Sequence, residues 1–286
     1  MNLADHPHVA RLIELALEED LPTGDATSES ILGSDSRATG IIAAREACVL
    51  AGLDVARAVF LRIDAELELV AHKQDGDPLT AGDEVLRVAG NAASILTAER
   101  TALNFLQRLC GIATLTARYV ERLAGTGTVL LPTRKTTPGQ RVLQRHAVRC
   151  GGGGLHRGSL SDGILIKDNH VDLAGGIERA IRRARAAAPQ TLKIEIETRT
   201  LDEVREAVAA GADIVMFDNM SVAEVHEALA ICPEGVRTEV SGGVTLETLR
   251  DYAETGVHAI SVGALTHSAP SADLGLDVVV PGGGAA

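Results

Sequence analysis

A stretch of basic residues within an acidic chain is the part of this sequence best suited to chemistry. Residues 132–171 contain seven Lys or Arg and two Asp, whereas the whole chain of 286 residues has a formal net charge of −12. A local cluster of cations in an otherwise acidic protein is typical of a site for an anionic ligand. We therefore expect these residues to form an anion-binding site.

The cations are of two kinds, and each kind suits a different anionic group. Arg134, Arg157 and the upstream Arg100 have planar guanidinium groups that bind carboxylates through two parallel hydrogen bonds. Lys135 and Lys167 are compact point charges that suit phosphate or pyrophosphate. The ligand, or pair of ligands, should therefore carry both carboxylate and phosphate groups.

Two acidic residues, Glu197 and Asp218, belong to the same predicted site. Carboxylates would repel an anionic ligand unless they bind sugar hydroxyls or a Mg²⁺ ion that bridges to the ligand's phosphates. These residues are therefore expected to bind sugar hydroxyls or a Mg²⁺ ion, held directly or indirectly.

Glycine-rich segments could supply backbone amides to a phosphate. Ser241, Gly242 and Gly243 allow N–H groups to approach an anion at the start of the next helix, and Gly263 with its neighbours could form a second such site. The alternative for each is a tight turn that requires glycine. Gly151–Gly154 indicate either close approach to a ligand, a change of shape, or a flexible loop.

The histidines and cysteines carry weaker signals. His156 either contacts substrate or satisfies a neighbouring polar group, His146 is expected at the surface or on a helix face, and His170 is undecided. The sequence contains no HExxH motif, the pattern that would indicate transition-metal catalysis. The four cysteines have no CxxC spacing, which favours reduced thiols that serve packing over disulfides or a zinc site: Cys48, Cys110, Cys150 and Cys232.

Regularly spaced strands should position these residues. Glu197, Asp218, Ser241 and Gly263 are separated by steps of 21, 23 and 22 residues, which is typical of successive βα units. The predicted strands cover 128–131, 163–167, 192–197, 213–218, 237–240 and 259–263.

Helix signals fall between these strands. Thr200 with Glu203, and Ser221 with Glu224, fit the capping-box pattern.

Because ligands bind at the carboxyl ends of parallel strands, the basic, acidic and glycine-rich residues should meet at one edge of the sheet. Six strands are visible where a closed barrel needs eight. The sheet is therefore a barrel with two cryptic strands, an incomplete barrel, or an open doubly wound sheet, and the sequence favours a barrel.

The first 110 or so residues differ in pattern. A helix over residues 9–18 precedes alternating segments typical of a small β-rich domain, and Ala92–Ala113 reads as a long helix. The glycine-rich tail at 281–286 should be flexible.

Composition excludes several classes of protein. No apolar run reaches the roughly 18–20 residues needed to cross a bilayer, and the N-terminal residues lack the order of a signal peptide. The acidic balance argues against nucleic-acid binding. We expect a cytoplasmic enzyme with no membrane or nucleic-acid partner.

At this point the motifs resemble a known family, quinolinate phosphoribosyltransferase, the decarboxylating nicotinate-nucleotide pyrophosphorylase. The resemblance covers nearly the whole chain, and the combination of TRKTTPG with LIKDNH at this spacing is highly specific. The motifs that carry it are ERTALNFLQRLCGIAT (99–114), TRKTTPG (133–139), AVRCGGG (147–153), HR (156–157), LIKDNH (165–170) and SGG (241–243).

The resemblance implies a fold. It predicts an incomplete α/β barrel of six or seven strands over 113–268, and an N-terminal β-rich α+β sandwich domain over 1–112 against which 269–286 pack. It also implies a homodimer, or a higher oligomer, whose active sites are shared between subunits.

The resemblance implies roles for single residues as well. Arg134, His156 and Arg157, with Arg100 from the partner subunit, would surround the two carboxylates of quinolinate. Lys135 and Lys167 would serve the substrate and phosphoribosyl pyrophosphate, while Glu197 and Asp218 would position the ribose and Mg²⁺. The 5-phosphate would be bound by the glycine-rich ends, namely Ser241, Gly242, Gly243, Gly263 and Ala264.

The implied reaction joins the pyridine nitrogen to ribose with loss of pyrophosphate and CO₂. It gives nicotinate mononucleotide for NAD biosynthesis and needs no organic cofactor.

Two residues depart from the family pattern, because Pro132 replaces a frequent Asp and Leu155 replaces a polar residue. A related phosphoribosyltransferase for another pyridine or aromatic acid therefore stays open. A non-catalytic subunit that binds a phosphometabolite is a third hypothesis, which the retained lysines and carboxylates oppose.

Overall fold

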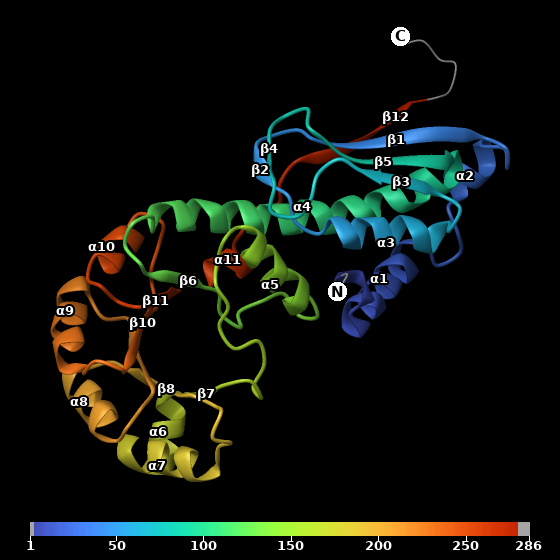
Figure 1. The fold of residues 1–286 in the computed structure, drawn as a ribbon. Helices are drawn as coiled ribbons and strands as arrows, with labels where there is room; N and C mark the ends of the chain where they lie inside the picture. Colours follow the sequence, from blue (N-terminus) through green and yellow to red (C-terminus); the bar gives the residue numbers. More distant parts are fainter. Residues whose placement is uncertain (1–2, 280–286) are drawn as a thin grey trace. The chain divides into compact units, whose positions relative to one another are not determined.

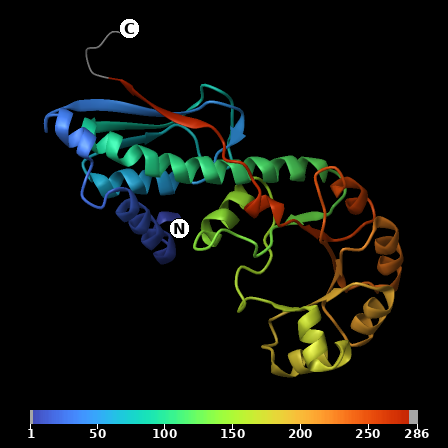
Figure 2. The same cartoon turned by 180° about the vertical axis from the view of Figure 1, so that it is seen from behind.

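The computed structural model describes residues 3–279, and the chain forms two compact units. Of the described residues, the first comprises 3–117, 136–152 and 266–279, and the second comprises 118–135 and 153–265. The predicted flexible tail at 281–286 lies outside the described residues. Figure 1 labels the elements of both units, and Figure 2 gives the view from behind.

An antiparallel sheet forms the centre of the first unit. Its strand order is β12-β1-β5-β3, so the C-terminal strand pairs with β1 through Thr39 and Val279 at one end and Ala44 and Leu274 at the other. The alternating segments of the sequence are these strands. The elements of the unit are η1 Leu3–Asp5, α1 Pro7–Asp20, α2 Ala26–Ile31, β1 Arg37–Ala44, β2 Cys48–Val49, α3 Leu53–Ile63, β3 Glu68–Ala71, β4 Pro78–Leu79, β5 Glu84–Asn91, α5 Arg141–Cys150 and β12 Leu274–Val279.

The long helix α4, Ala92–Arg122, is longer than predicted. The predicted end at Ala113 is wrong. Gly111, inside the helix, serves packing, because a Cβ there would lie 1.8 Å from the backbone oxygen of Pro270. Without a Gly or Pro that must end it, the helix continues for nine further residues after Ala113. Within residues 3–279, no helix is both long and apolar enough to cross a membrane.

The second unit is built on a parallel sheet of six strands in the order β6-β11-β10-β9-β8-β7, with helices α7 to α10 along its outer side (Figure 1). This confirms the predicted fold class, an incomplete α/β barrel with an N-terminal β-rich domain. Its elements are β6 Val129–Leu131, β7 Ile164–Ile166, α6 Asp168–Ala174, α7 Ile177–Ala187, β8 Ile194–Thr198, α8 Leu201–Ala209, β9 Ile214–Asp218, α9 Val222–Ile231, β10 Arg237–Ser241, α10 Leu249–Ala253 and β11 Ala259–Ser261, followed by α11 Ala264–His267.

Strand register brings the carboxyl ends of this sheet level with one another. Ser241 pairs with Asp218 on one side and with Ser261 on the other, and Glu197 pairs with Met216. The predicted helix caps fix the return helices: the Thr200 hydroxyl accepts a hydrogen bond from the Glu203 N–H, and Ser221 with Glu224 forms a capping box. The polar residues at the strand ends therefore share one edge.

Three of the four glycines at 151–154 have structural reasons within their own unit. A Cβ on Gly151 would lie 2.3 Å from the backbone oxygen of Ala113 in α4, and one on Gly154 would lie 2.8 Å from the side chain of Val129. Gly152 has a positive φ of 86°, which favours glycine. Close packing therefore accounts for Gly151 and Gly154, and backbone conformation accounts for Gly152.

Candidate active site

A cavity of about 660 Å³ lies at the carboxyl ends of the parallel strands. Its wall includes ten of the thirteen residues predicted for the site, all from the second unit. These ten are Arg134, Lys135, His156, Arg157, Lys167, Glu197, Asp218, Ser241, Gly242 and Gly243.

Two arginines share one part of the cavity. Arg134 follows β6, and Arg157 precedes β7 and donates a hydrogen bond from Nη1 to the backbone oxygen of Gly163 at 3.1 Å. Burial, and next the positive charge of Arg134, lower the pKa of the Arg157 guanidinium. Two cations that repel each other in a cavity would be stabilised by a ligand with two negative charges.

The lysines and carboxylates lie on neighbouring strand ends. Lys167, at the end of β7, forms an ion pair with Glu197 of β8, and Asp218 ends β9 beside it in the sheet. Lys135 is exposed. The ion pair keeps the Lys167 ammonium at the cavity wall, where it can bind an anion without a large change of conformation.

A buried acidic pair beneath His156 was missed from the sequence. His156 Nε2 lies 3.2 Å from Glu195 Oε2 and 3.6 Å from Glu239 Oε1, and both glutamates are buried. Burial lowers the pKa of His156, but the two carboxylates outweigh it and the pKa is raised. Burial, and next the charge of Glu195, raise the pKa of Glu239 to about 7.

The position of these glutamates could have been found from strand periodicity. Glu195 and Glu197 are two residues apart on β8, and Glu239 and Ser241 are two apart on β10. Residues at this spacing project from the same face of a strand. The first member of each pair lies one step deeper in the barrel than the predicted site residue.

Asn219 is another cavity residue that was not predicted. It is the one non-glycine residue between 3 and 279 with a positive φ, 58°, a conformation that Asn tolerates better than most residues. Its N–H donates to the backbone oxygen of Ser241 at 2.9 Å. A Cβ on Gly242 would lie 2.3 Å from its side-chain oxygen, so this position requires glycine.

The glycine segment after β10 differs from the prediction in one respect. Helix α10 begins at Leu249, so Gly242 and Gly243 belong to a loop and not to the start of a helix. Both have positive φ, 89° and 65°, and a Cβ on Gly243 would meet nothing within 4 Å. The backbone there is open toward the cavity that these residues line.

Three predicted residues lie outside the wall of this cavity. Gly263 and Ala264 follow β11, which contributes Ser261 to the wall. Arg100 is an exposed residue of α4 in the first unit. His170, left undecided above, accepts a hydrogen bond at Nδ1 from the Lys167 N–H and so caps α6.

The two residues that depart from the family pattern, Pro132 and Leu155, have different surroundings. Pro132 is buried directly after β6. Leu155 lines a second cavity, of about 440 Å³, whose wall includes residues from the amino ends of the strands such as Lys193 and Arg237. His156 and Arg157 line both cavities, so this leucine lies on the side of His156 away from the strand carboxyl ends.

Comparison with known proteins agrees with this geometry. Residues 25–110 match the family model for the quinolinate phosphoribosyl transferase N-terminal domain, and residues 112–277 match that for its C-terminal domain. A probable nicotinate-nucleotide pyrophosphorylase (carboxylating) of Bacillus subtilis is 43% identical over 276 residues, which cover 96% of this chain and 95% of the relative.

Solved structures agree as well. NadC from Streptococcus pyogenes is 41% identical with a TM-score of 0.92, covering 95% of this chain and 96% of that one. The nicotinate-nucleotide pyrophosphorylase from Francisella tularensis is 40% identical with a TM-score of 0.92, covering 98% and 99% of the two chains. The chain therefore belongs to the quinolinate phosphoribosyltransferase family.

Proposed function

We propose that this protein transfers a phosphoribosyl group to quinolinate and releases pyrophosphate and CO₂, forming nicotinate mononucleotide for NAD biosynthesis. The observation that carries the proposal is the cavity in which Arg134 and Arg157 lie together while Lys135 and Lys167 occur with Glu197 and Asp218. Relatives of about 40% identity over nearly the full chain carry the name of this activity.

Different side chains of the cavity bind different groups of the two substrates. Arg134 and Arg157, with His156, bind the two carboxylates of quinolinate, since guanidinium groups match carboxylates in shape and charge. Lys135 and Lys167 bind the pyrophosphate of the second substrate. The loop amides of Ser241, Gly242 and Gly243, with those of Gly263 and Ala264 after β11, bind the 5-phosphate.

Chemistry then follows from positioning and charge. The pyridine nitrogen attacks C1 of the ribose and the C1–O bond to pyrophosphate breaks, with the developing negative charge on the leaving group stabilised by the two lysines. The nitrogen is now positively charged. It stabilises the electron pair left on C2 when the adjacent carboxylate leaves as CO₂, and a proton then adds at C2.

Mg²⁺ is part of this proposal. Glu197 and Asp218, on adjacent strands, offer hard oxygen ligands, and Mg²⁺ is usually held by one or two carboxylates together with substrate phosphates and water. The donor set therefore fits the ion. When bound, it would neutralise charge on the pyrophosphate.

Substrate profiling tests the reaction. Purified protein with phosphoribosyl pyrophosphate and Mg²⁺ should convert quinolinate to a nucleotide with one CO₂ released per nucleotide, and chelation by EDTA should stop the reaction. The measurement follows nucleotide by absorbance after chromatography and CO₂ from carboxyl-labelled quinolinate.

The same assay with nicotinate separates the proposal from its main alternative, a phosphoribosyltransferase for a different pyridine. Pro132 and Leu155 are the residues that motivate that alternative. Nucleotide from nicotinate and none from quinolinate would overturn the proposed substrate and leave phosphoribosyl transfer standing.

We also propose a cytoplasmic homodimer with shared active sites. Free cysteines at positions 48, 110, 150 and 232 suit a reducing compartment. Arg100 is exposed on the first unit, which supports the proposal that it serves the cavity of a second copy.

Complementation tests the shared site. Arg100→Ala and Lys167→Met should each be nearly inactive as pure proteins. Co-expressed in equal amounts, they should recover about a quarter of the wild-type activity, because half of the dimers are mixed and each mixed dimer has one intact site. If mixed dimers are isolated and show no recovery, Arg100 does not act across an interface.

A further inference from the structure

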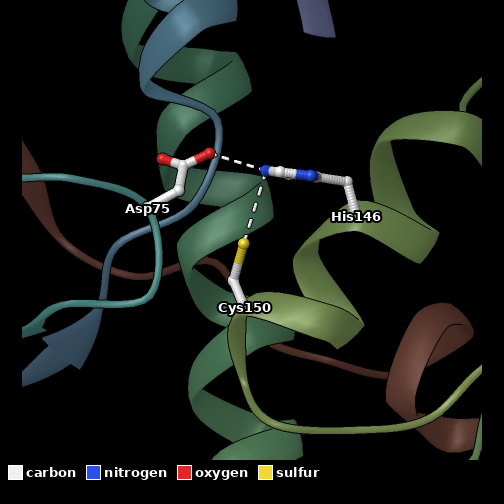
Figure 3. Close-up of side chains that lie close together, drawn as sticks. All are labelled: Asp75, His146 and Cys150. Atoms are coloured by element: carbon white, nitrogen blue, oxygen red, sulfur yellow. Dashed lines mark hydrogen bonds and ion pairs between the residues drawn. The ribbon is translucent and has the colours of Figure 1, made fainter. Parts of the chain in front are cut away.

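Three side chains of the first unit converge on one point outside the proposed active site. His146 Nε2 lies 2.6 Å from Asp75 Oδ2 and 3.3 Å from Cys150 Sγ (Figure 3). The oxygen and the sulfur therefore approach the same ring nitrogen. All three potential ligand atoms lie within 4.8 Å of one another.

One hydrogen bond from the His146 ring cannot satisfy both the Asp75 carboxylate and the Cys150 sulfur. A single Nε2–H can point at the carboxylate or at the sulfur, and the 2.6 Å contact gives the carboxylate the better bond. An ion placed between the three atoms would serve all of them. Ligand atoms around a tetrahedral zinc are about 3.3–3.7 Å apart, given metal–ligand bonds of about 2.0–2.3 Å, so shifts of about 1 Å or less would produce that spacing at His146.

Local structure presets two of the three ligands. His146 and Cys150 are four residues apart in α5, and residues at this spacing project from the same face of a helix. The sequence predicts packing thiols because it has no CxxC pair. The carboxylate that completes the group lies 71 positions before the histidine, a spacing that matches no metal-binding motif.

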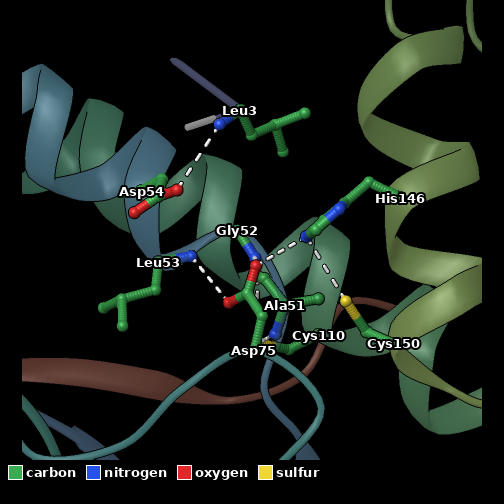
Figure 4. Close-up of polar contacts among 9 residues, drawn as sticks. All are labelled: Leu3, Ala51, Gly52, Leu53, Asp54, Asp75, Cys110, His146 and Cys150. Atoms are coloured by element: carbon green, nitrogen blue, oxygen red, sulfur yellow. Dashed lines mark hydrogen bonds and ion pairs between the residues drawn. The ribbon is translucent and has the colours of Figure 1, made fainter. Parts of the chain in front are cut away.

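The third ligand is held by backbone donors. Asp75 Oδ1 accepts from the Leu53 N–H, and Oδ2 accepts from the Gly52 N–H, each at 3.0 Å (Figure 4). These bonds fix the carboxylate and leave lone pairs of Oδ2 for a further partner. Hydrogen bonds of this kind orient metal-ligating carboxylates in known sites.

Charge and access are also suitable for a cation. The side chains of Asp75 and His146 are 20% and 31% exposed, so an ion and a completing water molecule can reach them. The Asp75 carboxylate, and next the Cys150 sulfur, raise the pKa of His146 to about 10. The negative potential that holds a proton on this ring would also attract a metal ion in its place.

We propose that Asp75, His146 and Cys150 bind a divalent transition-metal ion of the zinc class, with water in the fourth position. Thiolate and imidazole ligands select such ions over Mg²⁺ and Ca²⁺, which prefer oxygen. The ion links α5 to the segment between β3 and β4 within the first unit.

Cobalt spectroscopy of the full chain without an affinity tag tests the proposal. After dialysis against EDTA, the protein is titrated with Co²⁺, and the near-ultraviolet charge-transfer band of a cobalt–thiolate bond should reach its plateau at one ion per chain. Zn²⁺ should then displace the cobalt and abolish the band. Cobalt at the carboxylates of Glu197 and Asp218 gives no such band, because no thiol lines that cavity.

Variants identify the ligands. Cys150→Ser should remove the thiolate band, and His146→Asn should weaken Zn²⁺ binding at least about 10-fold, as competition with a chromophoric chelator would measure. Asp75 is left unchanged, since its carboxylate also caps α3. Cys232→Ser, which removes another part-exposed thiol, is the matched control and should bind like the wild type.

Circular dichroism separates loss of the site from loss of the fold, and Zn²⁺ should raise the melting temperature of the wild type more than that of folded Cys150→Ser. The proposal is overturned if no thiolate band forms, if the band persists in Cys150→Ser, or if it disappears in Cys232→Ser.

Discussion

Replacing Arg134 with Ala is expected to lower kcat/KM for quinolinate by about 10²–10³-fold, the cost of removing one partner from a desolvated charge pair. Both constants should change, with KM for quinolinate raised and kcat lowered, because a substrate carboxylate is left unpaired in binding and in reaction. KM for phosphoribosyl pyrophosphate should change much less. Steady-state kinetics with each substrate varied in turn measures these effects.

Two further variants show whether the shape of the guanidinium matters. Arg134→Lys keeps the charge but loses the planar pair of donors, so it should recover only part of the lost activity. Arg182→Ala removes an arginine whose side chain is 78% exposed in α7, and it should leave both kinetic constants unchanged. Wild-type kinetics in Arg134→Ala would exclude Arg134 from the site.

Much of the barrel could be predicted because its signals are local. Short β-branched runs about 22 residues apart mark βα units, and side-chain caps such as Ser221 with Glu224 mark where helices begin. All six predicted strands occur in the parallel sheet. Because ligands bind at the carboxyl ends of such strands, the residues at those ends could be predicted to form one site.

The rest depended on contacts that no local pattern records. Gly111 inside the long helix is required by the Pro270 backbone, more than 150 residues away, and no local pattern shows that contact. Charges at the predicted strand ends were visible, but the buried glutamates below them read as ordinary alternation. The group of Asp75, His146 and Cys150 joins a loop to a distant helix and has no sequence signature.

Removal of His156 should have the largest effect on stability. The ring is 12% exposed, and it separates the side chains of Glu195 and Glu239, which are 6% and 4% exposed. Oε1 of each glutamate is buried without a hydrogen-bond partner among the described residues. His156→Ala therefore leaves two buried carboxylates close together without the imidazole. We expect the free energy of unfolding at pH 8 to fall by about 3–5 kcal/mol, as when one partner of a buried ion pair is removed, measured by urea denaturation.

The pH dependence identifies the cause of this loss. The pKa of Glu239 in the folded protein is about 7, raised from 4.5 mainly by burial, so the folded state favours its neutral form. Protonation of Glu239 therefore stabilises the folded state fully below pH 4.5, and this stabilisation is lost as the pH rises through 7. The charge of His156 lowers the Glu239 pKa, so without the imidazole that pKa should rise further, and the pH at which this stability is lost should be higher in His156→Ala than in the wild type.

Adding Glu239→Gln should restore part of the loss at pH 8, because it removes one of the two charges. His226→Ala, at an exposed position of α9, is the control for loss of a histidine and should be neutral. If the pH at which stability is lost does not shift and the double variant shows no recovery, packing of the ring, rather than its contact with the two carboxylates, is what the barrel needs.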